Sequence, residues 1–173
     1  MPPQDPQEQE QAAQKAPTTM SEAQKQAMQA EIDRQNESKP GQDGHAVLSG
    51  KRILWVEDDK FLGNIVSKRM SEYKCEMFLA KNGDEAFAYL KSQKQPPHII
   101  VLDLVLPGMS GFDILKNIRN DLSLAGVPVM VLSNLNQSAD VERAKILGAQ
   151  KFMVKASVSL DEIIRNIETL MAK

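Results

Sequence analysis

The sequence predicts an α/β fold: a doubly wound sheet of five parallel strands with helices on both faces. From residue 50 onward, short β-branched runs alternate five times with amphipathic runs, which is the pattern of consecutive βα units. The run HIIVLD at 98–103 is apolar between its ends, as a strand covered on both faces must be. The 124 residues from 50 to 173 are too few for a closed eight-stranded barrel, so an open sheet is expected.

Each strand and helix has a local signal in the sequence. We expect strands at 51–56, 75–80, 98–103, 127–133 and 151–155, and helices at 61–73, 83–92, 110–120, 138–147 and 159–171. In the first of these helices, the helical repeat places six residues on one face: Leu62, Ile65, Val66, Arg69, Met70 and Tyr73.

Helix ends are also marked. Asp84 and Glu85 lie in a first turn, where the helix dipole favours acids. Gly148 follows the fourth helix, as a left-handed terminating residue would. Ser159 and Glu162 have the spacing of a capping box.

The first 49 residues differ sharply from the rest. They contain ten Gln, five Pro and no aromatic residue, and they carry four basic against eight acidic side chains. A segment so poor in large apolar groups cannot offset its ordering entropy by burial. We therefore expect a mostly disordered extension over 1–49, followed by one domain over 50–173, with 39–44 as a linker. Residues 21–37 are the exception, because Ser21 precedes a helix-forming run; this is either a frayed tail helix or a helix that docks onto a partner.

Composition excludes several classes of protein. A net charge of −2 argues against a general nucleic-acid binder, and we expect no direct DNA binding. The single cysteine, Cys75, cannot form an internal disulfide. No apolar run is long enough for a membrane span, and the N-terminus lacks a secretory signal, so a cytoplasmic protein without membrane contacts is expected. His45 and His98 lie too far from other metal-binding residue types to suggest a zinc site.

Chemically complementary residues follow four of the five predicted strands. Glu57 and Asp58 follow the first strand, Asp103 ends the third, Ser133 the fourth and Lys155 the fifth. Sites in open α/β sheets form at the carboxyl ends of the strands. If the strand order reverses between strands one and three, the three carboxylates converge and repel one another, which a divalent cation such as Mg²⁺ would relieve. Taken singly, these residues could be a solvated loop, a helix cap, a turn residue and a surface charge; taken together, they favour a site.

Residues 51–171 resemble the receiver domain of two-component response regulators. The resemblance rests on ILWVEDD at 53–59, IIVLDLVLPGMSGFDIL at 99–115, VPVMVLSN at 127–134 and FMVKAS at 152–157, and it covers all five βα units. It implies a flavodoxin-like sheet of order 2-1-3-4-5. It also implies a stand-alone, chemotaxis-regulator-like domain, because about one helix follows the fifth strand.

The resemblance assigns roles to individual residues. It implies that Asp103 accepts a phosphoryl group from a sensor histidine kinase or a phosphotransfer protein, and that the chain catalyses only its own phosphorylation and dephosphorylation. The expected Mg²⁺ ligands are Glu57, Asp58, Asp103 and the backbone carbonyl of Val105. Ser133 and Lys155 would bind the phosphoryl oxygens. Ser133 and Phe152 would form the switch, and the surface over 138–171 would contact a downstream protein.

The sequence departs from the family pattern in three ways. Ala156 stands where the family has a proline after the lysine, often in a cis bond, which leaves the path of the loop at Lys155 open. Asn134 replaces a small residue after Ser133. Val105 and Leu135, at positions that tune hydrolysis in the family, are apolar and cannot orient water, so slow loss of the phosphoryl group is expected.

Two other functions stay open at this point. One is a pseudo-receiver that binds partners without phosphorylation. The other is a Mg²⁺-dependent phosphatase with an aspartate nucleophile, similar to the haloacid dehalogenases. Those phosphatases need a second acid two residues after the nucleophile, where this chain has Val105.

Overall fold

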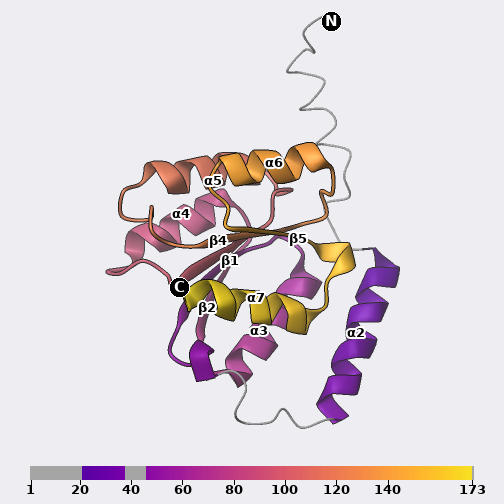
Figure 1. The fold of residues 1–173 in the computed structure, drawn as a ribbon. Coiled ribbons are helices and arrows are strands. Elements are labelled where there is room, and N and C mark those ends of the chain that lie inside the picture. The colour runs from indigo at the N-terminus through magenta and orange to yellow at the C-terminus, as the bar shows by residue number, and fades with distance from the viewer. Residues whose placement is uncertain (1–20, 38–45, 173) are drawn as a thin grey trace, which may run out of the picture.

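A five-stranded sheet, with all strands parallel, forms the middle layer of the protein (Figure 1). The computed structural model describes residues 21–37 and 46–172. The strand order is β2-β1-β3-β4-β5, as the resemblance to receiver domains implied. The strands are β1 Arg52–Val56, β2 Glu76–Ala80, β3 Ile99–Leu102, β4 Val129–Ser133 and β5 Lys151–Val154. The helices are α2 Glu22–Glu37, α3 Lys60–Glu72, α4 Gly83–Ser92, α5 Gly111–Asn120, α6 Ser138–Ile146 and α7 Leu160–Met171, with short 3₁₀ turns at Ala46–Leu48 and Lys155–Ser157.

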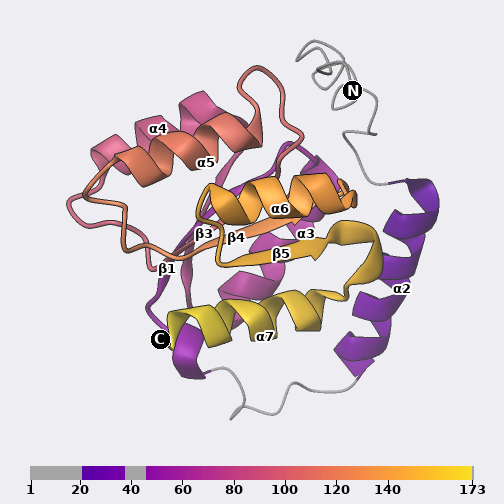
Figure 2. The ribbon, with the colours of Figure 1, turned by 45° about the horizontal axis from the view of Figure 1, so that its top comes forward.

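Helices cover both faces of the sheet. Figure 2 shows α3 and α7 on one side and α4, α5 and α6 on the other. Alternate residues of β1 point to opposite faces, so that Trp55 packs with the side chains of α3 and α7 while Leu54 packs with those of α4 and α5. Two apolar cores thus hold the central strands rigidly between them. None of the described helices combines the length and the apolar character that crossing a membrane requires.

The predicted helix ends agree with the observed caps. The Ser159 hydroxyl accepts from the Glu162 amide at 3.2 Å, and Asp84 and Glu85 lie in the first turn of α4. Gly148 has a φ of +98° just past α6, a backbone conformation that glycine adopts without steric cost. The fifth strand is shorter than predicted, because the chain turns into a 3₁₀ turn at Lys155. All described peptide bonds are trans, including the one between Lys155 and Ala156.

The first 49 residues contribute more to the fold than their composition suggested. Residues 22–37 form α2, and Ser21 caps it by accepting from the Gln24 amide at 3.2 Å. Leu48 is fully buried in the core next to α3 and α7, so the packed region begins before residue 50. The predicted disorder of 1–20 and the predicted linker at 39–44 lie outside the described residues.

Arg119 ties together two loops at the end of the sheet opposite the strands' carboxyl ends. Its guanidinium donates to the carbonyl oxygens of Gly148 at 2.9 Å, Val127 at 2.9 Å and Leu124 at 3.3 Å, and to Oε1 of Gln150 at 2.9 Å. Burial lowers the pKa of this side chain, but the charge is well solvated by these backbone acceptors.

We expect Arg119→Met to lower the free energy of unfolding by about 2 kcal/mol, because several carbonyl oxygens lose their donor at once. Lys116→Met is the matched control, since Lys116 is exposed on the same helix; its effect should stay within about 0.5 kcal/mol. Urea unfolding followed by circular dichroism measures both. Equal midpoints for the two variants would contradict a structural role for the guanidinium.

Candidate functional site

The register of the central strands brings two acidic segments side by side. Val56, the last residue of β1, pairs with Leu102, the last residue of β3, so Glu57 and Asp103 emerge next to each other. The backbone pairing continues past the strand ends, because the Asp103 amide donates to the Val56 carbonyl at 3.0 Å. Parallel pairing of neighbouring strands therefore fixes where both carboxylates begin.

Three carboxylates meet at this edge of the sheet. Glu57, Asp58 and Asp103 each offer an oxygen, and these oxygens all lie within 4.8 Å of one another. The side chains of Glu57 and Asp103 are almost completely buried, at 1% and 2% exposure, whereas Asp58 is partly exposed. Like charges at this separation repel strongly where water is scarce, so the cluster needs positive charge nearby.

Lys155 supplies that charge. Its ammonium lies 2.5 Å from Oδ2 of Asp103 and 2.5 Å from Oε2 of Glu57, and it is itself buried. The Ser133 hydroxyl donates to Oδ1 of Asp103 at 2.7 Å, and the Val105 amide donates to the same oxygen at 3.1 Å. The Asp103 carboxylate is thus held by an ammonium, a hydroxyl and a backbone amide from three segments.

The electrostatics follow from burial and these contacts. Burial raises the pKa of Glu57 from 4.5 to about 7; the Lys155 ammonium works against this rise and the Asp103 carboxylate adds to it. Burial and the Asp103 charge also raise the pKa of Asp58. Burial alone would lower the pKa of Lys155, but attraction to Asp103 and Glu57 outweighs it, so the pKa is raised and the ammonium stays charged.

The acidic cluster has the chemistry of a divalent cation site. Oδ1 of Asp58 is buried without a hydrogen-bond partner, and Oε2 of Glu57 has the Lys155 ion pair in place of a hydrogen bond. Buried carboxylate oxygens without donors are costly. Hard oxygen ligands in this number suit Mg²⁺, which retains several waters. The residues present therefore fit the cation that the sequence predicted.

The remaining predicted residues lie around this centre. Phe152 pairs with Val131 and packs, half-buried, against a cluster that includes Leu104 and Phe112. It lies on the strand that leads to Lys155 rather than among the carboxylates. Leu135 is buried in the same cluster, and Oδ1 of Asn134 is buried without a hydrogen-bond partner.

Asp59 has a part in the site that the sequence did not reveal. It caps α3, accepting from the amides of Phe61 at 2.8 Å and Leu62 at 3.2 Å, and its own amide donates to Oε1 of Glu57 at 3.1 Å. Asp59 thereby fixes the loop and orients Glu57. An aspartate directly before an amphipathic helix was the available signal, but the predicted start at residue 61 lay one residue past the observed one.

Gly111 is a second position whose role depends on tertiary contact. A Cβ atom there would lie 2.2 Å from the Asp103 carbonyl oxygen and 2.4 Å from Cα of Leu104. Its amide donates to the Leu104 carbonyl at 3.0 Å. The first turn of α5 therefore rests directly on the backbone that carries Asp103, and only glycine allows this approach.

Comparison with known proteins identifies the family of this domain and agrees with its fold. Residues 53–168 match the family model of the response regulator receiver domain. The chain belongs to the response regulator receiver family.

Several relatives share this domain. The chain is 31% identical over 118 residues to the transcriptional regulatory protein CrdR of Helicobacter pylori, covering 68% of this chain and 54% of CrdR. It is 24% identical over 121 residues to the protein PilH of Pseudomonas aeruginosa, covering 70% of this chain and 98% of PilH. The chain thus spans about half the length of CrdR and nearly all of PilH.

Solved structures have the same fold. The phosphorylated cyanobacterial phytochrome response regulator RcpA is 27% identical with a TM-score of 0.61, covering 70% of this chain and 91% of RcpA. The receiver domain of the P. aeruginosa sensor histidine kinase PA1611, which has magnesium in its active-site cleft, has a TM-score of 0.64 at 21% identity, covering 72% of this chain and 100% of that domain.

We expect Gly111→Ala to destabilise the protein by about 1–3 kcal/mol, because the added methyl group forces α5 away from the Asp103 backbone. Gly126→Ala is the control, since a Cβ there meets nothing within 4 Å. Thermal unfolding of both variants tests the contact. A melting temperature of Gly111→Ala equal to that of the control would show that the close approach is absent in solution.

Removing the Lys155 charge should leave three acids without a counter-charge. We expect Lys155→Met to lower the unfolding free energy by about 3 kcal/mol in metal-free buffer. Added Mg²⁺ should raise the melting temperature of this variant more than that of the wild type. Lys81→Met, an exposed lysine that follows β2, serves as the control and should behave as the wild type. Equal Mg²⁺ shifts in all three proteins would argue against charge compensation by Lys155.

Proposed function

We propose that this receiver accepts a phosphoryl group on Asp103 from a histidine kinase or phosphotransfer protein. The observation that carries the proposal is the environment of the Asp103 carboxylate. It is bound by Lys155, Ser133 and the Val105 amide and lies beside Glu57 and Asp58. Each of these donors can turn from the free carboxylate to the oxygens of a phosphoryl group on it, which is what positioning and charge stabilisation of phosphoryl transfer require.

Mg²⁺ is the proposed cofactor. Glu57, Asp58 and Asp103 would hold it with their carboxylates, and the backbone carbonyl of Val105 is the proposed further ligand. When bound, the ion would supply positive charge to the oxygens of the phosphoryl group. The unpartnered Asp58 oxygen supports this assignment.

The transfer itself is a displacement at phosphorus. A carboxylate oxygen of Asp103 forms a bond to the phosphorus of a phosphohistidine, and the bond between phosphorus and the imidazole nitrogen breaks. The electron pair of that bond remains on the imidazole, which leaves as a neutral group because its other ring nitrogen carries a proton. The product on this chain is an acyl phosphate, whose charge the Lys155 ammonium offsets.

Phosphorylation would be communicated through Ser133. Its hydroxyl now donates to Asp103, and a phosphoryl group would draw it outward to a new acceptor. Because Val131 and Ser133 lie on β4 beside β5, space vacated near Ser133 is open to Phe152. We propose that this change alters the surface over 138–171, made by α6, β5 and α7, and so its affinity for a downstream protein.

We propose that the protein is a signalling acceptor in the cytoplasm rather than a turnover enzyme. Two other functions would give different outcomes when the protein is incubated with a phosphoryl compound and Mg²⁺. A pseudo-receiver would take up no phosphoryl group. A phosphatase would release phosphate continuously from a monoester, but its second acid is missing at Val105, which supports the receiver.

Incubation with acetyl phosphate and Mg²⁺ should add one phosphoryl group to the intact mass of the wild type. Asp103→Asn should gain none, because the amide is not a nucleophile. Asp84→Asn, which alters an exposed acid beside the same edge of the sheet, should be labelled as the wild type is. Labelling of folded Asp103→Asn, or no labelling of the wild type, would refute the acceptor assignment.

Slow loss of the phosphoryl group is a separate expectation. Val105 and Leu135 have apolar side chains without a hydrogen-bonding atom, so neither can orient an attacking water. After removal of acetyl phosphate, the label should persist for minutes or longer, as followed by intact mass. Val105→Gln should shorten its lifetime and Val105→Leu should not. A lifetime of seconds in the wild type would contradict this expectation.

A further inference from the structure

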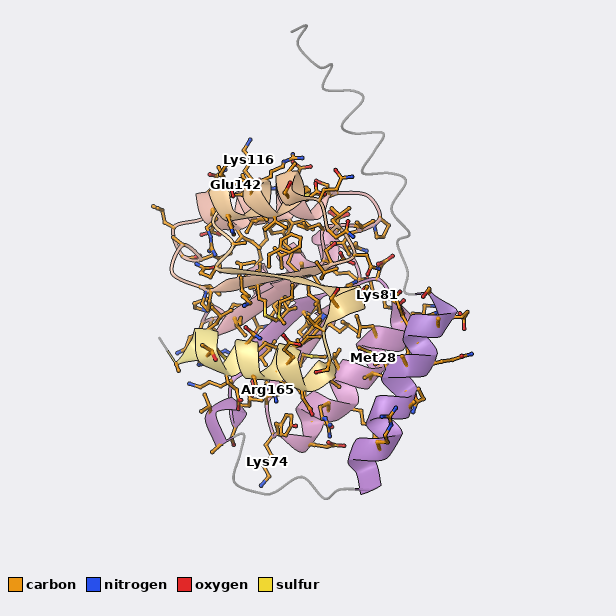
Figure 3. All side chains as sticks on the ribbon, turned by 45° about the vertical axis from the view of Figure 1, so that its right-hand side comes forward. Met28, Lys74, Lys81, Lys116, Glu142 and Arg165 are labelled. Atoms are coloured by element: carbon orange, nitrogen blue, oxygen red, sulfur yellow. The ribbon has the colours of Figure 1, made fainter. Side chains whose placement is uncertain are left out.

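The helix α2 lies outside the βα units and packs on their surface. In Figures 1 and 2 it runs beside α3 and the start of α7. Met28, labelled in Figure 3, is 7% exposed and joins the core that includes Leu62 and Leu160. One turn earlier, the Lys25 ammonium lies 6.0 Å from the centre of the Phe61 ring. The sequence predicts either a frayed tail helix or a helix that docks onto a partner, and the structure shows this helix docked on its own chain.

The surface beneath α2 is a groove. A cavity of about 250 Å³ remains between the helices, lined by Gln29 of α2, by Phe61, Asn64, Ile65, Lys68, Arg69 and Glu72 of α3, and by Leu160 of α7. Its lining combines apolar side chains, such as Ile65 and Leu160, with charged ones, such as Lys68 and Glu72. This is the form of a groove that takes one face of an amphipathic helix.

Met28 is the buried anchor of α2 among the side chains that the structure describes. Among its described side chains only Met28 is buried, whereas α7 buries Leu160, Ile163, Ile164 and Ile167. The cavity shows that α2 does not fill the groove, so its contacts with α3 are incomplete. An isolated helix of this length is marginal in water, so α2 depends on its contacts with the domain to remain folded, and Met28 is the buried one among its described side chains.

We propose that the groove between α3 and the start of α7 is a helix-binding site, which α2 occupies in cis and vacates to admit an amphipathic helix of a protein partner. The partner helix would present one long apolar side chain to the place of Met28 and a cation near Phe61. The groove begins at Phe61, two residues after Asp59, which caps α3 and orients Glu57. A partner bound in the groove would therefore contact α3, whose start positions a carboxylate beside Asp103.

The first test measures release of α2 in the full-length chain. Lys25 and Arg34 are trypsin sites within α2, and cleavage there tracks the population of the undocked helix. Met28→Asp should be cut at least about tenfold faster than the wild type. Ala27→Asp is the matched control, because Ala27 is exposed on the same turn, and it should be cut no more than about twofold faster. Asn64→Leu, which adds apolar volume at the cavity, should slow cleavage.

The second test asks whether the vacated groove binds a helix. A fluorescent peptide of residues 21–37 should bind full-length Met28→Asp and bind the wild type at least about tenfold more weakly, because α2 already occupies the groove there. The same peptide carrying Met28→Asp should bind neither protein.

Three results would overturn the proposal. The first is equal rates of trypsin cleavage for Met28→Asp and Ala27→Asp. The second is equal binding of the peptide by the wild type and Met28→Asp. The third is that α2 of the wild type loses its protection from trypsin when the protein is diluted. The last would mean that α2 comes from a second copy. None of these measurements depends on phosphorylation of Asp103.

Discussion

The interaction on which the site depends is the contact of one buried ammonium with two buried carboxylates. Parallel pairing of β1 and β3 forces Glu57 and Asp103 together, and Lys155, which follows β5, offsets the resulting repulsion by reaching both carboxylates across the end of β4. The same arrangement prepares the chemistry, since the groups that neutralise Asp103 in the free protein are the groups that a phosphoryl oxygen needs. The side chains that neutralise the buried Asp103 carboxylate are therefore the same ones that the proposed phosphoryl transfer uses.

The scaffold protects this charged cluster by making its backbone rigid. Two apolar cores sandwich β1 and β3, whose residues are nearly all buried. At the carboxyl edge, Asp59 caps α3 and orients Glu57, while Gly111 lets α5 rest on the Asp103 backbone. These two contacts come from the starts of helices, so a change in either helix would be felt by the carboxylates. Rigid supports of this kind keep reacting groups in place without cost at the moment of reaction.

The N-terminal helix adds a second level of organisation. Its only buried described side chain, Met28, reaches the core on the side of α3 and α7, opposite to α6, which lies on the proposed output surface. The fold thus has two faces on which a protein could act, one governed by Phe152 and Ser133 and one covered by α2, and the two meet at the start of α7. Loose packing beneath α2 fits a contact that exchanges, whereas the tight packing of α7 fits a permanent part of the fold.

The sequence alone determined the elements, their order and the chemistry at the strand ends. Hydrophobic periodicity and caps such as Ser159 and Gly148 are local properties, so they predict element ends to within a residue or two. Tertiary structure decided which of the assembled groups touch. Three contacts depend on strand register and helix packing. The Lys155 ammonium contacts both acids, Asp59 orients Glu57, and Met28 anchors α2. These join residues far apart in the chain, and no local pattern encodes such distances.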